Sequence, residues 1–177
     1  MVEKKTDTDT PVVWHKTSLR VPLFEVDLGQ AVYHGNYFHL FELGREAFLR
    51  DLGHPYRRFM EQQLHLTIVE ASCSYRRPLH YDELIEVHTG VKWWRSRSLA
   101  FSQAIYRSTE EEGAVLCTEA ILNMVCVRFT GQPTTLPREF VDLLKRWTQG
   151  SSPLMGKADR DRKIAGERGS HAVGNSH

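Results

Sequence analysis

Apolar positions follow two different periods along the chain, one typical of strands and one typical of a helix. Residues 12–26 are rich in β-branched and aromatic side chains and predict a first strand, which ends at the turn formers of residues 27–30. Residues 33–53 instead carry apolar side chains at a spacing of three and four, which predicts a long amphipathic helix. Gly53 and Pro55 end this helix, because glycine suits its C-terminal cap and proline cannot continue it. The apolar face consists of Tyr37, Leu40, Phe41, Gly44, Phe48 and Leu52.

The second half of the chain is dominated by long strand patterns. These are residues 67–77, 84–97, 99–107 and 114–129, all rich in Val, Ile, Leu and aromatic side chains. The last of them would span roughly 50 Å if fully extended, so we expect it to bend or to contain a bulge. Residues 137–147 begin with a proline at the first helical position and predict a short closing helix.

One helix with a single apolar face needs a sheet to cover it, so the order of elements predicts a single α+β domain. We place this domain at residues 11–148. Residues 1–10 are polar or charged and predict a flexible arm. Residues 149–177 are rich in Gly, Ser and charge without a sustained period, and predict a flexible tail.

Composition limits which binding partners and which cellular compartment we expect. The 23 Lys and Arg nearly balance the 22 Asp and Glu. A net charge of +1 gives no overall electrostatic attraction to nucleic acid or to a membrane surface. The three cysteines lack C-x-x-C spacing, and neither an apolar leader nor a run of about 18 apolar residues is present. We therefore expect a soluble, cytoplasmic protein. No phosphate-binding glycine loop and no metal-ligand spacing is found, so we expect neither cofactor nor metal.

The segment that joins the first strand to the long helix reads DLGQAVYHGNY, from Asp27 to Tyr37. It resembles the D-x-x-G-x-V-Y-H-x-N-Y signature of the 4-hydroxybenzoyl-CoA and YbgC-type acyl-CoA thioesterases, with Gln30 where the signature has glycine. A second segment, YRRPLHYDEL at residues 75–84, resembles the junction between two strands in that family. The signature positions that match are Asp27, Val32, Tyr33, His34, Asn36 and Tyr37.

This resemblance implies a hotdog fold, in which a curved antiparallel sheet wraps a long central helix. It also implies hydrolysis of an acyl-CoA substrate and a homodimer or homotetramer with active sites near the subunit interface. Asp27 would be the central catalytic residue, and the resemblance implies a role for His34 as well.

Thioester hydrolysis needs a nucleophile or base at the carbonyl carbon and stabilisation of charge on the carbonyl oxygen. The start of a helix supplies unpaired backbone N–H groups, which His34 and Gly35 offer here. Asp27 would act as the nucleophile or as the general base for a water. The His34 imidazole would orient Asp27 or that water.

Two other functions fit the same fold. A hydratase or dehydratase acting on enoyl or hydroxyacyl thioesters would place its carboxylate on the long helix, where Glu42 and Glu46 lie. A non-catalytic acyl-CoA-binding protein is the second, favoured slightly because Leu23 stands where many YbgC-like members have tyrosine. Basic side chains that could grip coenzyme A phosphates are Lys92, Arg95, Arg97, Arg76 and Arg77.

Overall fold

The computed structural model describes residues 12–109 and 113–150. The arm predicted for residues 1–10 lies outside this part of the chain, as does the predicted tail beyond residue 150. In chain order the elements are β1 (His15–Arg20), η1 (Leu23–Glu25), η2 (His34–Asn36), α1 (Tyr37–Asp51), α2 (Arg57–Glu61), β2 (Leu64–Tyr75), β3 (Leu84–Trp94), β4 (Ser98–Thr109), β5 (Gly113–Arg128) and α3 (Arg138–Thr148).

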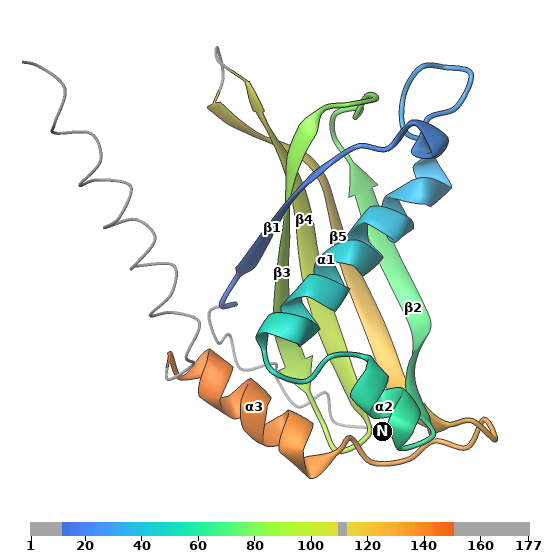
Figure 1. The fold of residues 1–177 in the computed structure, drawn as a ribbon, viewed down its shortest axis with the longest axis vertical. Coiled ribbons are helices and arrows are strands. Elements are labelled where there is room, and N and C mark those ends of the chain that lie inside the picture. Colours follow the sequence, from blue (N-terminus) through green and yellow to red (C-terminus); the bar gives the residue numbers. More distant parts are fainter. Residues whose placement is uncertain (1–11, 110–112, 151–177) are drawn as a thin grey trace, which may run out of the picture.

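The strands form one antiparallel sheet in the order β1-β3-β4-β5-β2, and α1 crosses one of its faces (Figure 1). The loop between β1 and α1 lies at one end of the sheet, while α2 and α3 lie at the other end (Figure 1). The predicted α+β hotdog architecture, a long helix covered by a curved antiparallel sheet, is confirmed.

Several element boundaries differ from the sequence prediction. The first strand ends at Arg20 rather than at residue 26, and the 3-10 turn η1 follows Pro22, which has no N–H for a sheet. The short helix α2 was not predicted, because five residues are too few to show a helical period. β2 begins at Leu64, three residues earlier than expected.

The bulge expected in the last long strand is confirmed. Ile105 pairs with Thr118 but Tyr106 pairs with Leu116, so Cys117 is an extra residue on β5. A second bulge lies on β2, where Ile68 pairs with Met124 and Glu70 pairs with Asn123. Bulges increase the local twist of a strand, which lets these long strands curve around α1.

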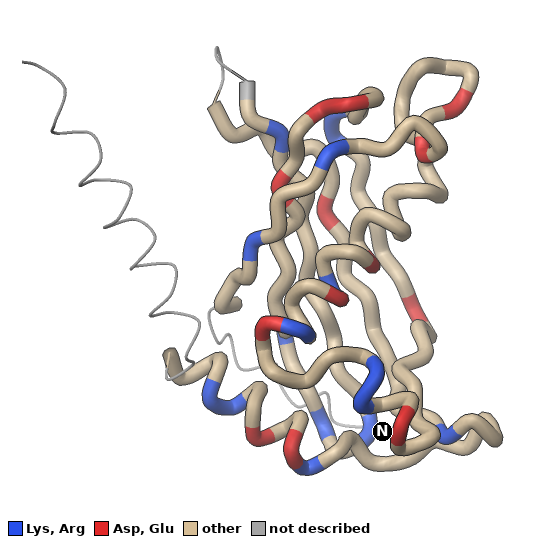
Figure 2. The backbone as a smooth tube through the Cα atoms, in the orientation of Figure 1, with Lys and Arg blue, Asp and Glu red and all other residues tan. Residues whose placement is uncertain are grey.

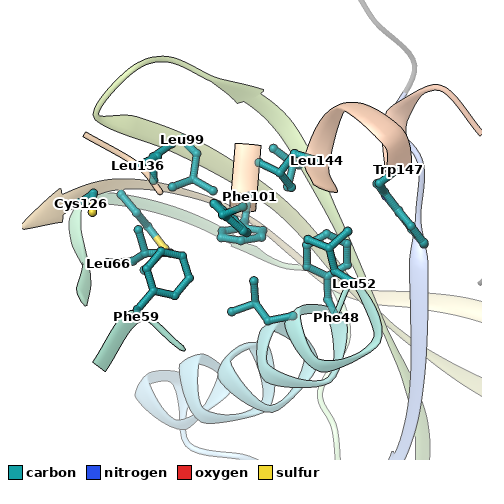
Figure 3. Packing of buried hydrophobic residues seen from close by; sticks show 14 of the residues in the cluster. Phe48, Leu52, Phe59, Leu66, Leu99, Phe101, Cys126, Leu136, Leu144 and Trp147 are labelled. Atoms are coloured by element: carbon teal, nitrogen blue, oxygen red, sulfur yellow. The ribbon is translucent and has the colours of Figure 1, made fainter. Parts of the chain in front are cut away.

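Two apolar clusters hold α1 on the sheet. In the first, shown in Figure 3, the ring of Phe48 lies edge-on to Phe101 and Trp147, with centroid distances of 6.0 and 5.5 Å. Gly44 sits where α1 lies close against β3, since a Cβ there would lie 2.4 Å from Cγ1 of Val87. This contact explains a glycine on the apolar face of the helix.

His54 is a buried polar residue at the junction of α1, α2 and α3. Its side chain is fully buried between the rings of Phe59 and Phe140, and neither ring nitrogen has a hydrogen-bond partner among the described residues. Because burial disfavours the charged imidazolium, the pKa of His54 lies below its usual value.

The buried, neutral His54 should make the protein acid-sensitive. The unfolded chain takes up a proton on this imidazole as the pH falls through about 6.5, while the folded protein does not until a lower pH. The stability contributed by the neutral ring is therefore present above about pH 6.5 and is lost as the pH falls toward the folded-state pKa. Urea unfolding between pH 7.5 and 5 should show a smaller loss of free energy of unfolding for His54→Leu than for wild type; equal losses would contradict this.

Charged residues of both signs occur throughout the described part of the chain. Figure 2 shows Lys and Arg interspersed with Asp and Glu along both the helices and the strands. Among residues 12–109 and 113–150, no helix is long and apolar enough to cross a membrane.

Candidate active site

Asp27 lies in a tight loop between η1 and η2, closed by its own backbone. Val26 and Val32 form an antiparallel bridge across the loop, and the Asp27 N–H donates to the carbonyl of Ala31 at 3.0 Å. The Asp27 carboxylate accepts a hydrogen bond from the backbone N–H of Gly29 at 2.7 Å. This bond fixes one carboxylate oxygen, while the side chain as a whole remains exposed in the single chain.

Gln30 occupies the strained position of this loop. Its φ is 63°, in the left-handed region that glycine enters without cost. This is the position where the thioesterase signature has glycine, a residue that enters this backbone region more easily than glutamine does.

Glu25 ties the Asp27 loop to the start of α1, and it was missed by sequence reasoning. Its carboxylate is only 2% exposed and meets Nδ1 of His39 at 3.0 Å. Its backbone carbonyl accepts from the Tyr33 N–H at 3.0 Å and from Nδ2 of Asn36 at 3.1 Å. The sequence did not single out Glu25 because this residue lies within residues 12–26, which were predicted to form the first strand.

The start of the helix presents two backbone donors without an acceptor among the described residues. Within the described part of the chain, no acceptor takes the N–H of His34 or of Gly35. The His34 ring packs on Tyr33 at a centroid distance of 4.1 Å. A Cβ on Gly35 would come within 3.0 Å of the Tyr33 ring, so a larger residue would crowd this turn.

A cavity of about 300 Å³ opens beside this helix start. Tyr75, at the end of β2, donates its hydroxyl to the carbonyl of His34 at 2.8 Å and meets the ring of Tyr37 edge-on. Burial, followed by the nearby Cys73 thiol, raises the pKa of Tyr75 to about 12, so the hydroxyl keeps its proton at neutral pH. The cavity is lined by Val32, His34, Tyr37, Tyr75, Arg76, Arg77 and Pro78.

The structure thus places His34 on the cavity wall, Gly35 next to it, and Asp27 on the adjoining loop but outside the lining. Tyr75 was named only as the first residue of the second family-like segment, and its contact with His34 was not foreseen. In the described residues, no group of three or more His, Cys, Asp or Glu side chains could hold a metal ion.

The expected basic cluster is divided between two ends of the sheet. Arg76 and Arg77 bind the carbonyl of Cys117 through their backbone and line the cavity, and Arg76 also forms an ion pair with Glu119. Arg97 lies beside Cys126 instead, nine residues further along β5, or roughly 30 Å in an extended strand. The two groups of basic side chains therefore cannot bind the phosphates of one coenzyme A together within a single chain.

The described fold is a hotdog fold, with the candidate site at the start of its central helix. A family model described as the thioesterase-like superfamily matches residues 21–144, and the chain belongs to this superfamily. The predictions of family and of thioester hydrolysis are thereby confirmed, and the hydratase and non-catalytic alternatives are not favoured.

Individual relatives support this assignment. A protein of Aquifex aeolicus (strain VF5) is 32% identical over 126 residues, which cover 71% of this chain and 94% of that protein. The acyl-CoA thioesterase YbgC of Haemophilus influenzae is 28% identical over 123 residues, or 68% of this chain and 87% of that protein. The structure of 4-hydroxybenzoyl-CoA thioesterase from Pseudomonas sp. strain CBS-3 shares the fold, with a TM-score of 0.66, 20% identity, and coverage of 73% of this chain and 98% of that one.

Proposed function

We propose that the chain hydrolyses an acyl-CoA thioester to the free acid and coenzyme A, with Asp27 as the catalytic residue. The observation that carries this proposal is the pair of unpaired backbone N–H groups at His34 and Gly35, beside a cavity and next to the loop that holds a fixed carboxylate. A developing oxyanion is stabilised by such preorganised donors, one of which is typically worth about 3 kcal/mol.

In the proposed reaction the thioester carbonyl oxygen lies at the helix start and accepts from the two backbone donors. Asp27 then attacks the carbonyl carbon through a carboxylate oxygen, and the thiolate of coenzyme A leaves, which produces a mixed anhydride that water hydrolyses. Alternatively, Asp27 removes a proton from a water that attacks the same carbon. A single turnover in ¹⁸O water separates the two routes, because only the anhydride route can place the label in Asp27.

The activity is tested by measuring free thiol released from a panel of acyl-CoAs by purified protein. Thiol release above the uncatalysed rate is the expected result. Loss of enoyl-CoA absorbance without thiol would identify a hydratase, and tight binding without any turnover would identify a binding protein; either would overturn the proposal.

Tyr75 should assist by holding the His34 carbonyl, and with it the direction of the neighbouring N–H groups. Tyr75→Phe removes a hydrogen bond worth about 0.5–1.5 kcal/mol, so kcat should fall about two- to tenfold. Tyr81→Phe is the matched control, since the Tyr81 side chain is exposed and its hydroxyl has no partner in the described chain. Equal kcat values for Tyr75→Phe and wild type would show that the contact has no role in turnover.

We propose that two copies of the chain pair through their β2 strands. The pair would be a homodimer or one half of a homotetramer. β2 is a twelve-residue strand at the edge of the sheet, and it exposes Ile68 and Val69. Long exposed edges with apolar side chains are places where sheets pair. The large apolar side chains of the Asp27 loop, Phe24 and Leu28, are also exposed in the single chain.

Antiparallel pairing of two β2 strands would place the Tyr75 end of one copy beside the Leu64 end of the other. In that arrangement we expect the partner to cover the Asp27 loop, which would place the active site near the subunit interface.

A lysine at the middle of this edge should weaken the dimer. Val69→Lys is expected to raise the dimer dissociation constant at least tenfold, measured by sedimentation equilibrium, because a hydrated charge would replace an exposed apolar side chain at the centre of the interface. Leu84→Lys is the control, since Leu84 is similarly exposed but lies on β3. A dimer of unchanged affinity in Val69→Lys would rule out pairing along β2.

The cytoplasm is the compartment that we propose. Cys73, Cys117 and Cys126 are all free thiols, and Cys117 and Cys126 are buried. Unpaired cysteines are typical of reducing compartments.

A further inference from the structure

The Asp27 loop is held at its base, where Glu25 meets the start of α1. After β1 the chain makes the 3-10 turn η1, passes through the loop and returns at η2, directly before α1 (Figure 1). Glu25 is the last residue of η1, and its carbonyl accepts from the N–H of Tyr33, the residue before η2. Asp27 lies only two residues beyond Glu25. The position of Glu25 therefore determines where the Asp27 carboxylate lies.

Glu25 contacts the start of α1 through two different groups. Its carbonyl also accepts from Nδ2 of Asn36, the residue directly before α1, at 3.1 Å. Its two carboxylate oxygens lie 3.0 and 3.3 Å from Nδ1 of His39, the third residue of α1. An ionised carboxylate only accepts hydrogen bonds, so Nδ1 of His39 is the donor. One residue of the loop is thus bound at two points of the helix start.

The two partners of the carboxylate contact differ in their exposure to water. The Glu25 side chain is 2% exposed, whereas the His39 side chain is 61% exposed. Burial of a carboxylate is costly unless hydrogen bonds or an opposite charge compensate for the lost water. The His39 imidazole supplies this compensation. Without it, the Glu25 carboxylate would regain water only by turning outward, and the Asp27 loop would move with it.

We propose that Glu25 and His39 form a clamp that fixes Asp27 relative to the backbone donors at the helix start, and that Glu25 is a positioning residue for thioester hydrolysis. The assignment rests on the proposed thioesterase function. Neither side chain lines the cavity, so the clamp acts through Asp27 and not through contact with the substrate. Displacement of a reacting group by about 1 Å can lower the rate about 10²-fold, so a loosened clamp should be visible in kcat.

The test measures kcat and KM for thiol release by variants of the clamp. His39→Ala leaves a buried carboxylate without its donor, so kcat should fall at least about tenfold while KM stays unchanged. Glu25→Gln keeps an oxygen that accepts from Nδ1 of His39 and leaves no charge to bury, so kcat should stay within about threefold of wild type. Adding His39→Ala to Glu25→Gln should then cost less than about threefold, because no buried charge remains.

The Glu86–His88 pair on β3 supplies the matched control. Nε2 of His88 lies 2.9 Å from Oε2 of Glu86, and neither residue lines the cavity. His88→Ala should keep the wild-type kcat. Because the clamp acts through Asp27, adding His39→Ala to Asp27→Asn should lower the residual kcat by less than about twofold. A further tenfold fall in that background would overturn the positioning role.

Backbone amide hydrogen exchange, followed by NMR, reports on the clamp without any substrate. The amides of Asp27 and Tyr33 donate hydrogen bonds within the loop, and they should exchange at least about tenfold faster in His39→Ala than in wild type. Glu25→Gln should stay near the wild-type rate at both amides. The amide of Leu122, which is buried in β5, should exchange equally in all these proteins.

The two measurements together separate this proposal from the proposed function. Unchanged exchange in the loop of His39→Ala would overturn the clamp, whether or not wild type releases thiol. Thiol release with equal kcat in His39→Ala and wild type would overturn the positioning role and leave hydrolysis standing. Faster exchange in His39→Ala, with no thiol released by wild type, would support the clamp and overturn the hydrolase.

Discussion

Asp27→Asn is expected to lower the kcat of thioester hydrolysis by about 10²–10⁴-fold with little change in stability. Asparagine keeps a side-chain oxygen that can accept from the Gly29 N–H, so the turn that now binds the carboxylate at 2.7 Å should persist. The amide, however, can neither attack the thioester carbonyl nor take a proton from water. Thiol release under saturating substrate, together with a thermal melt of both proteins, measures the two effects.

Asp82→Asn is the matched control for this substitution. Asp82 is also an exposed loop aspartate, its φ of 64° is one that asparagine adopts readily, and its partner is Arg20 rather than any residue of the cavity. This variant should keep the wild-type kcat. Similar activity in Asp27→Asn and wild type would remove Asp27 from the mechanism, and another group would then have to attack the thioester carbonyl or activate the water.

Phe48→Ala should produce the largest loss of stability, about 3–5 kcal/mol. The Phe48 ring is fully buried where α1 meets β4 and α3, through its contacts with Phe101 and Trp147. Removing it leaves a cavity that a close-packed core cannot fill without moving α3. Urea denaturation monitored by tryptophan fluorescence measures the change, since Trp147 itself lies against the ring.

Phe129→Ala serves as the control, because Phe129 is 58% exposed just beyond β5. Its replacement should change the free energy of unfolding by less than about 0.5 kcal/mol. Comparable losses for the two variants would mean that the packing around Phe48 does not limit stability, and that α3 is held mainly by other contacts.

The backbone of the candidate site could be predicted because it is local in sequence. Asp27, His34 and Gly35 lie within nine residues, so a strand exit, a turn and a helix start bring them into one region through short-range geometry. The helix face of α1 and the bulge in β5 were predictable for a related reason: periodicity and strand length depend only on the order of residues. The family resemblance lies in this same contiguous segment.

Contacts between distant segments could not be predicted in this way. Tyr75 reaches His34 across 41 residues, because β2 runs beside the start of α1, and Arg45 meets Gln103 across 58 residues. On a helical wheel Arg45 looks like a solvated charge, and only the sheet packed over α1 makes it a buried wall of a cavity. The sequence by itself determined the fold class and the turn that carries Asp27, since the elements and the turn depend on local conformational preference. The tertiary structure alone decided which polar side chains are buried away from water, because their burial depends on contacts between segments that are distant in sequence.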